Sequence, residues 1–337
     1  KYNFFKFITV TKQRSLVYAL DLGGTSTKAA VLDLKTGQVL DKWQFFMGYG
    51  DKIVVNFAAH FKKRLNLHNW HENQFKAVGL VIKCPYDKKR GLAVRAVGIG
   101  WTDYPILRAM QAAFPFCPIF ICNDATGALL GEWKHGVGQK YSSLLYVIIG
   151  RGVGGGILLD NKIWDGAHNL SGEIGHGGDM QTIYKCGCPS RGNCTEGSSS
   201  AYAMEKAFSD YASEHPNSRI ASYWKSGEKR IALKDIAPLI KIRDLTTMKI
   251  FNKCLRPLAA RISMAIFMLD VEAVIIGGGI TALGDHLLEP LWKMVRQYLW
   301  PTFQKGVVLK VATLGNDAGF YGAFALAKQG LETSKDG

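Results

Sequence analysis

The sequence predicts an α/β protein of two domains, and three observations lead to this prediction. The chain has 337 residues, which is enough for two domains of roughly 150 residues each. Hydrophobic residues make up 47% and charged residues 20%, a composition that is typical of globular proteins and excludes intrinsic disorder. Each half of the chain opens with a strand, a glycine-rich turn and a second strand. We therefore expect two α/β domains with related openings.

The first half opens as a β-meander and continues with helices and strands in alternation. Turns at 23–24 and 35–37 separate three segments of strand composition. Apolar residues at helical spacing then predict a helix over 51–71. The expected elements are strands at 16–22, 27–34 and 38–46, a helix at 51–71, a strand at 77–82, a helix at 105–114, a strand at 117–124 and a helix at 125–134.

The second half repeats the opening and is then mainly helical. A glycine-rich turn at 150–156 separates the first two strands of this half. A later apolar run ends in three glycines and leads into a helical pattern. The expected elements are strands at 142–149 and 157–160, helices over most of 200–270, a strand at 271–279, a helix at 283–299, a strand at 306–314 and a closing helix at 316–329.

Glycine-rich loops occur at three places, and the element after each loop limits what it can bind. Gly150, Gly152 and Gly155 satisfy G-x-G-x-x-G, but a dinucleotide-binding loop needs a helix after it, and here a strand at 157–160 follows. A strand also follows the loop at 21–25. Backbone N–H groups in such hairpin loops can approach phosphate oxygens because no Cβ intervenes, although a plain hairpin is the alternative.

The third loop, Gly277–Gly279, follows a strand and precedes a helix, and with Ala282 it fits G-x-G-x-x-A. This arrangement leaves an NAD enzyme as an alternative. No acidic residue ends the next strand at 306–314, where a ribose-binding carboxylate is expected, so an NAD enzyme is disfavoured. A helix N-terminus at this loop can still hold the nucleotide part of ATP.

Charge and cysteine content limit the partners and the location. The formal net charge of +15 favours anionic partners, but the basic residues are spread out as on solvated helix faces, so we expect no nucleic-acid partner. No run of 18 apolar residues is present, so we expect no membrane partner. The odd number of seven Cys, without a secretory signal, predicts reduced thiols and a cytoplasmic location.

Seven short motifs follow one another along residues 16–330. They are DLGGTSTK (21–28), CNDATGALLGE (122–132), GRGVGGG (150–156), GEIGH (172–176), CGCPSRGNCTE (186–196), IIGGG (275–279) and LGNDAGFYGA (314–323). With these motifs the chain resembles the ROK family of sugar kinases, which contains bacterial glucokinases and N-acetylhexosamine kinases.

The resemblance implies an actin-like, ribonuclease H-like α/β fold with two domains around a cleft. It implies a small domain of residues 1–123 with the closing helix 316–330, and a larger domain of residues 124–315 with a zinc loop. We expect the first two glycine loops and Asp124 to face each other across the cleft. Family members are often dimers, so a homodimer is also expected.

The resemblance further implies that ATP phosphates lie against the first two glycine loops and adenosine near the third. Asp21 ends a strand before a glycine turn and would hold Mg²⁺ directly or through water; a hydrogen bond to its own turn is the alternative. The implied ATP-binding residues are Asp21, Gly23, Gly24, Thr25, Lys28, Gly150, Arg151, Gly152, Gly154, Gly155, Gly277, Gly278 and Gly279.

A sugar kinase needs a base within reach of the attacking hydroxyl, and most of its remaining work is positioning and charge neutralisation. Asp124 ends an apolar strand, and the resemblance makes it this base; an N-cap on the following helix is the alternative. The implied sugar-binding residues are Asn123, Asp124, Glu173, His176 and Glu196.

Three cysteines within nine residues require an explanation in a reduced compartment. Cys186, Cys188 and Cys194 together with His176 have the Cys₃His composition of a closed structural zinc site. Three buried free thiols are the alternative. Zinc would use one imidazole nitrogen and leave the other to orient a sugar hydroxyl.

The chain departs from the family pattern near the expected sugar and phosphate sites. Lys83 and Cys84 replace a usual Pro-Gly pair, and the usual Asn before Gly100 and Trp101 is missing. Arg151 stands where Thr is common, so it would either clamp additional phosphate charge or crowd the loop. The cysteine loop is one residue longer than usual.

These residues favour an ATP-dependent hexose kinase, with glucose as the first substrate to test. The nearest alternative is an N-acetylmannosamine or N-acetylglucosamine kinase. A sugar-sensing repressor of the same family needs a helix-turn-helix, and about fifteen residues before the first strand are too few for one. A non-catalytic sugar or polyphosphate binder is the remaining alternative, suggested by Lys83, Cys84 and Arg151.

Overall fold

A computed structural model of the chain describes residues 14–178, 180–188 and 192–334. Residues 1–13 of the expected small domain and residues 189–191 of the cysteine motif lie outside this part. Among the described helices, none combines the length and the apolar character that crossing a membrane would require.

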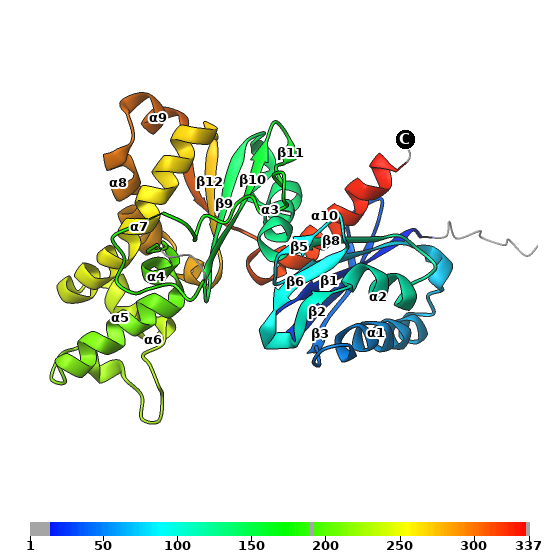
Figure 1. The fold of residues 1–337 in the computed structure, drawn as a ribbon, viewed down its shortest axis with the longest axis horizontal. Coiled ribbons are helices and arrows are strands. Elements are labelled where there is room, and N and C mark those ends of the chain that lie inside the picture. The colour runs from blue at the N-terminus through cyan, green and yellow to red at the C-terminus, as the bar shows by residue number, and fades with distance from the viewer. Residues whose placement is uncertain (1–13, 179, 189–191, 335–337) are drawn as a thin grey trace, which may run out of the picture. The chain divides into compact units, whose positions relative to one another are not determined.

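The chain folds into two compact units, named here the first and the second unit. The first unit contains the residues up to Gly127 and those from Gly319 onward, and the second unit is Ala128–Ala318. The chain passes from one unit to the other within two helices, α3 (Asp124–His135) and α10 (Ala318–Thr333) (Figure 1).

The first unit is built on a five-stranded sheet of order β3-β2-β1-β4-β8. The first three strands are antiparallel, and β1, β4 and β8 are parallel. The elements of this unit are β1 (Leu16–Leu22), β2 (Ser26–Asp33), β3 (Val39–Phe46), α1 (Lys52–His68), β4 (Phe75–Ile82), β5 (Tyr86–Asp87), β6 (Leu92–Ala96), β7 (Trp101–Tyr104), α2 (Ile106–Ala113) and β8 (Ile119–Asn123), with the start of α3 and most of α10.

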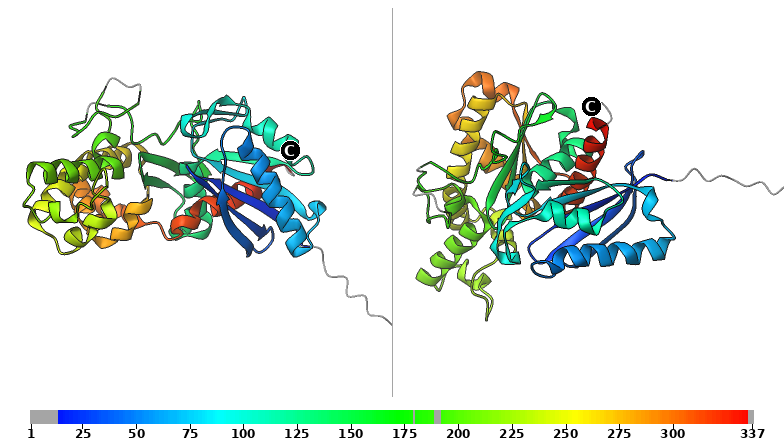
Figure 2. Two further views of the ribbon diagram at one scale, coloured as in Figure 1. Left: turned by 90° about the horizontal axis from the view of Figure 1, so that it is seen from below. Right: turned by 45° about the vertical axis from the view of Figure 1, so that its right-hand side comes forward.

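Different helices cover the two faces of this sheet. Leu16, Tyr18 and Leu20 of β1 share a core with apolar residues of α1 and α2. The alternate residues Val17 and Ala19 share a second core with α10 (Figure 2). This period of two follows from the strand geometry, and burial on both faces explains the nearly continuous apolar sequence of β1.

α10 lies unusually close to β4. A Cβ at Gly79 of β4 would overlap the backbone carbonyl of Ala323, so only glycine leaves room for the helix at this point. A Cβ at Gly319, near the start of α10, would likewise overlap the carboxylate of Asp21. The missing side chains therefore let α10 pack directly against the strands that carry the polar residues.

The second unit has its own five-stranded sheet, of order β11-β10-β9-β12-β13. An antiparallel hairpin of β9 and β10 is joined by β12 and β13, which run parallel to β9. The strands are β9 (Leu144–Ile149), β10 (Val153–Leu159), β11 (Lys162–Ile163), β12 (Ala273–Gly277) and β13 (Val308–Val311).

Helices complete the second unit, and their buried residues form one core with the sheet. α7 contributes residues such as Phe251, Leu255, Leu258 and Ile262, which recur at the spacing of one helix face. The helices are α4 (Glu196–Ser199), α5 (Ala201–Glu214), α6 (Leu233–Lys241), α7 (Leu245–Leu269), α8 (Asp285–Tyr298) and α9 (Pro301–Gly306). Short 3₁₀ helices in the two units are η1 (Glu72–Gln74), η2 (Val97–Ile99), η3 (Val137–Lys140), η4 (Ala221–Tyr223), η5 (Gly279–Leu283) and η6 (Gly315–Asp317).

The predicted order of elements is confirmed in both halves, including the meander and the strand–turn–strand openings. Several details were wrong or missing. The second strand of the second half begins at Val153, so Gly154–Gly156 belong to β10 and not to the turn expected over 150–156. The small sheet β5–β6–β7 was not predicted. The strand expected over 306–314 spans only Val308–Val311. The helix α9 occupies the start of the expected segment, because it runs from Pro301, whose fixed φ suits the first helical turn, to Gly306. The helix expected over 283–299 spans Asp285–Tyr298, and the 3₁₀ helix η5 lies between it and the glycine tract.

Candidate active site and metal centre

In the first unit, polar residues gather at the carboxyl ends of three parallel strands. Asp21 is near the end of β1, Lys83 directly follows β4, and Asp124 directly follows β8. The strand register pairs Asp21 with Val81 and pairs Ile82 with Asn123, which brings all three ends to one edge of the sheet. Ligands of open α/β sheets bind at such an edge, so this is the candidate site of the first unit.

Asp124 is the first residue of α3, and its carboxylate is partly buried. Oδ1 accepts a hydrogen bond from the amide of Ala125 at 3.0 Å. Burial raises the pKa of Asp124, while the positive charge of Lys83 acts in the opposite direction. A carboxylate with a raised pKa is a stronger base than a solvated one, which is the property that proton abstraction requires.

Asn123 has a structural task that the sequence prediction missed. Its Oδ1 accepts a hydrogen bond from the amide of Thr126 at 2.9 Å, so Asn123 caps the N-terminus of α3. The alternative role considered for Asp124, capping this helix, is thus filled by its neighbour. The Asn-Asp pair at the end of a strand and the start of a helix was the signal that could have predicted this division.

Asp21 lies in the same charged group. Its pKa is raised to about 6, mainly by burial and also by the charge of Asp124, against the opposing charges of Lys28 and Lys83. Lys28 is opposite Asp21 in the register of β1 and β2. Two carboxyl groups and two lysines therefore share this edge, and their charges partly balance.

The glycine turn after Asp21 exposes its backbone. The amide of Gly23 donates to the carbonyl of Ser26 at 3.0 Å, and this bond closes the turn. Gly24 and Thr25 are exposed, and a Cβ on Gly24 would meet no atom within 4 Å. The turn thus leaves space above its backbone that an anionic group could enter.

In the second unit, the loop between β9 and β10 and the first residues of β10 contact two other segments. A Cβ on Gly155 would lie 2.8 Å from the carbonyl of Gly172, and one on Gly175 would overlap the carbonyl of Val153. The amide of Ala201 donates to the carbonyl of Gly150 at 2.8 Å. Several glycines of this region are therefore required for loop packing. Arg151 is exposed, and a Cβ on Gly150 would meet nothing within 4 Å.

Glu196 connects these segments. Its Oε2 accepts a hydrogen bond from the amide of Val153 at 2.9 Å, and the thiol of Cys186 donates to Oε1 at 3.2 Å. The backbone amide of Glu196 donates to the carbonyl of Gly175 at 3.0 Å. The carboxylate expected to bind sugar thus also reaches the glycine loop expected to bind phosphate.

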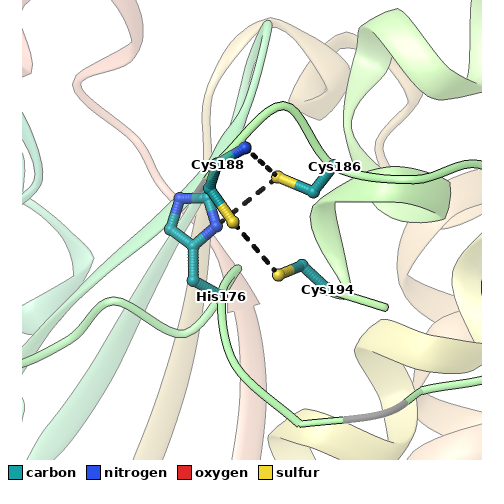
Figure 3. A group of neighbouring side chains, drawn as sticks. All are labelled: His176, Cys186, Cys188 and Cys194. Carbon is teal, nitrogen blue, oxygen red and sulfur yellow. Dashed lines mark hydrogen bonds between the residues drawn. The ribbon is translucent and has the colours of Figure 1, made fainter. Parts of the chain in front are cut away.

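His176, Cys186, Cys188 and Cys194 form one cluster, with their ligand atoms within 4.8 Å of one another (Figure 3). The Sγ atoms of Cys188 and Cys194 are 3.5 Å apart, and Cys186 Sγ is 3.7 Å from His176 Nδ1. Tetrahedral zinc with Zn–S bonds of about 2.3 Å separates its sulfurs by about 3.8 Å. The donor set and its spacing therefore fit a zinc ion.

The second imidazole nitrogen of His176 points toward Glu173. Nε2 is 4.0 Å from the Oε2 atom of Glu173, while Nδ1 faces the sulfur cluster. A ligand histidine is commonly oriented by a group at its other nitrogen. His176 and Glu173 thus stand where the metal cluster meets the expected sugar-binding loop.

The third glycine tract lies against the end of β9. A Cβ on Gly278, whose φ is 91°, would overlap the carbonyl of Ile149, and one on Gly277 would overlap the hydroxyl of Tyr146. A Cβ on Gly279 would meet nothing within 4 Å. The tract is adjacent to the glycine loop of the same unit, but an α-helix N-terminus does not begin there, contrary to the expectation.

Comparisons with known proteins agree in one family. The model of the ROK family matches residues 17–330. A glucokinase of Halalkalibacterium halodurans is 31% identical over 317 residues, 92% of this chain and 94% of the glucokinase. The crystal structure of a ROK family glucokinase from Streptomyces griseus, in complex with glucose and AMPPNP, has a TM-score of 0.78 at 27% identity and covers 93% of this chain and 99% of that one. A xylose repressor of Bacillus spizizenii is 22% identical over 92% of this chain and 76% of the repressor.

Proposed function

Because the chain belongs to the ROK family, whose actin-like α/β fold it has, we propose that it is an ATP-dependent hexose kinase with Asp124 as the general base. The observation that carries this proposal is the partly buried carboxylate of Asp124 at the carboxyl edge of the first sheet, with a raised pKa. Hexose phosphorylation is supported by the similarity to glucokinases along nearly the whole chain.

In the proposed reaction, a sugar hydroxyl attacks the γ-phosphorus of ATP. The Asp124 carboxylate accepts the proton of this hydroxyl while the new O–P bond forms and the bond from phosphorus to ADP breaks. Burial favours this transfer because it makes the carboxylate more basic. Lys83 limits the effect by holding part of the Asp124 population in the ionised form that can act as a base.

ATP is proposed to bind along three glycine-rich segments, in which Gly24, Arg151 and Gly279 are exposed. These are the turn with Gly23, Gly24 and Thr25, the loop with Gly150, Arg151, Gly152, Gly154 and Gly155, and the tract Gly277–Gly279, with Lys28 near the first. The carboxylate of Asp21 fits a hard oxygen ligand for Mg²⁺, and Mg²⁺ bound there would neutralise phosphate charge.

The sugar hydroxyls are proposed to bind Asn123, Asp124, Glu173, His176 and Glu196. The zinc cluster of His176, Cys186, Cys188 and Cys194 would hold together the two segments that carry Glu173, His176 and Glu196. His176 would belong to both sets, with Nδ1 toward the metal and Nε2 toward the sugar side.

Glucose is the first substrate to test, and N-acetylmannosamine and N-acetylglucosamine are next. Lys83 and Cys84 stand where the family has a small Pro-Gly pair, and Cys84 is buried beside Asp124, so the pocket differs near the base. The similarity to a xylose repressor keeps a sugar-sensing protein as the second candidate.

The test is an ADP-release assay with glucose, the two N-acetylhexosamines and xylose as acceptors. We expect Asp124→Asn to lower kcat by at least about 100-fold, because the amide cannot accept the hydroxyl proton. The circular dichroism spectrum should be unchanged, since an amide can keep the hydrogen bond from Ala125. A kcat within a fewfold of the unchanged protein would refute Asp124 as the base, and sugar binding without ADP release would favour the sensor.

A further inference from the structure

The side chain of Glu196 lies where two proposed sites of the second unit meet. It stands at the first position of α4, and Oε2 accepts the backbone N–H of Val153 at 2.9 Å. A Cβ added to Gly152 would overlap the same oxygen, so the carboxylate sits directly against the glycine loop. The side chain of Val153 is buried in the core of the second unit.

This position is fixed by backbone contacts on both sides of Glu196. Its own amide donates to the carbonyl of Gly175 at 3.0 Å, and a Cβ at Gly175 would overlap the carbonyl of Val153. Two residues beyond α4, the amide of Ala201 donates to the carbonyl of Gly150 at 2.8 Å. The glycine loop, the GEIGH loop and the start of α4 therefore form one interlocked group of segments.

A carboxylate on an amide of a phosphate-binding loop occupies a donor that phosphate would use. Its negative charge also repels a polyphosphate that approaches the loop. The same carboxylate is one of the groups proposed to accept sugar hydroxyls. The carboxylate has acceptor sites left for sugar hydroxyls, and each such hydrogen bond shares its charge, so it weakens both the bond to the Val153 amide and the repulsion of phosphate.

We propose that Glu196 couples sugar binding to ATP binding. In the sugar-free protein its carboxylate occupies the Val153 amide and opposes the phosphates of ATP. Sugar hydroxyls share the charge of the carboxylate and loosen its bond to the amide, which strengthens ATP binding. This inference rests on the proposed function, because it takes the sugar and phosphate sites of the second unit from it.

Thermodynamic linkage makes the coupling reciprocal, so ATP must strengthen sugar binding by the same factor. Such coupling typically amounts to a factor of about 5 to 150. It disfavours nucleotide binding without a sugar acceptor, and it therefore limits ATP hydrolysis by water. Glu196 acts here as a positioning residue, because its effect on the nucleotide passes through the Val153 amide.

The test is a calorimetric titration of the zinc-loaded protein with AMPPNP and Mg²⁺, without sugar and with saturating sugar. In the unchanged protein, the sugar should lower the Kd for AMPPNP by at least about fivefold. Glu196→Gln keeps the shape and the acceptor oxygen but removes the charge. We expect it to lower the sugar-free Kd for AMPPNP about fivefold and to abolish most of the sugar effect.

The matched control is Glu173→Gln, which neutralises the other proposed sugar carboxylate of this unit. This variant should bind sugar more weakly but keep the sugar-free Kd for AMPPNP. An equal shift in both variants would overturn the proposal, because general charge would then explain it. An unchanged or higher sugar-free Kd in Glu196→Gln would also overturn it.

A second measurement needs only the unchanged protein and stands even if the variants fold poorly. If none of glucose, N-acetylglucosamine and N-acetylmannosamine strengthens AMPPNP binding, the coupling is refuted. The proposed function fails separately if AMPPNP binds but none of the sugars supports ADP release from ATP. In that case the sugar-free comparison of Glu196→Gln with the unchanged protein still decides whether Glu196 opposes the nucleotide.

Discussion

The two units hold their reactive side chains by different means. In the first unit, Asp21 and Asp124 lie at the ends of parallel strands, and the ladder of one sheet sets their spacing. In the second unit, Glu173, His176 and Glu196 lie on loops or at the start of a four-residue helix. The first site thus takes its order from a hydrophobic core, whereas the second depends on a few loop contacts and on the cysteine cluster.

The strongest test of this difference is removal of the metal. If zinc occupies the cluster, it contributes on the order of 4 kcal/mol at a thousandfold excess over its Kd, and chelation removes this contribution. We expect hydrogen exchange to accelerate in residues 172–178 and 192–201, which surround the cluster, and sugar affinity to fall. Exchange in the strands β1 and β8 should not change, because no residue of the cluster belongs to the first unit.

Substitutions of single cysteines provide the matched control for chelation. Cys194→Ser removes a fully buried ligand and should reproduce the effect of chelation on exchange and on zinc content. Cys117→Ser changes a partly buried thiol of the first unit and should leave the zinc content unchanged. Equal zinc content in the Cys194→Ser variant and the unchanged protein would show that the cluster is not the metal site.

A smaller effect is expected from crowding the first sheet. Gly79→Ala places a methyl group against the carbonyl of Ala323, so α10 must shift away from β4. Overpacking of this kind costs about 1–3 kcal/mol, which urea unfolding can measure. Gly24→Ala is the control, because its Cβ meets nothing within 4 Å and its free energy of unfolding should stay nearly constant. Equal stability of the two variants would contradict the close packing of α10.

The difference between regular strands in the first unit and loop contacts in the second also determines how much of each site the sequence could predict. In the first unit, the turns at 23–24 and 35–37 and the apolar runs correctly predict the meander and place Asp21 and Asn123 at strand ends. The sheet β5–β7 was missed because its strands are only two to five residues long and offer too few positions for a period of two to be recognised.

In the second unit, composition was informative but contacts were not predictable. The spacing of Cys186, Cys188 and Cys194 predicts a group that the fold does bring together with His176. The bond from Val153 to Glu196 joins residues 43 positions apart, at the starts of β10 and α4, and no periodic pattern relates them. Periodicity predicts residues on regular elements, whereas a loop contact is fixed only by the packing around it.

The smallest expected effect concerns the charge balance of the first site. Burial raises the pKa of Asp124 and the positive charge of Lys83 lowers it, so Lys83→Ala should raise this pKa further. The proposed base must be ionised to act, and a higher pKa leaves less of it ionised in mild acid. The acid limb of the kcat/KM profile should therefore move to higher pH, with little change at pH 8.

Lys76→Ala is the control for this shift, because Lys76 is exposed at the opposite end of the same strand and donates to the carbonyl of Asn73. Its profile should match that of the unchanged protein. A profile of Lys83→Ala that is lowered equally at all pH values would instead assign Lys83 to substrate binding. A shift to lower pH would contradict the charge balance itself, because removing a nearby cation can only disfavour an ionised carboxylate.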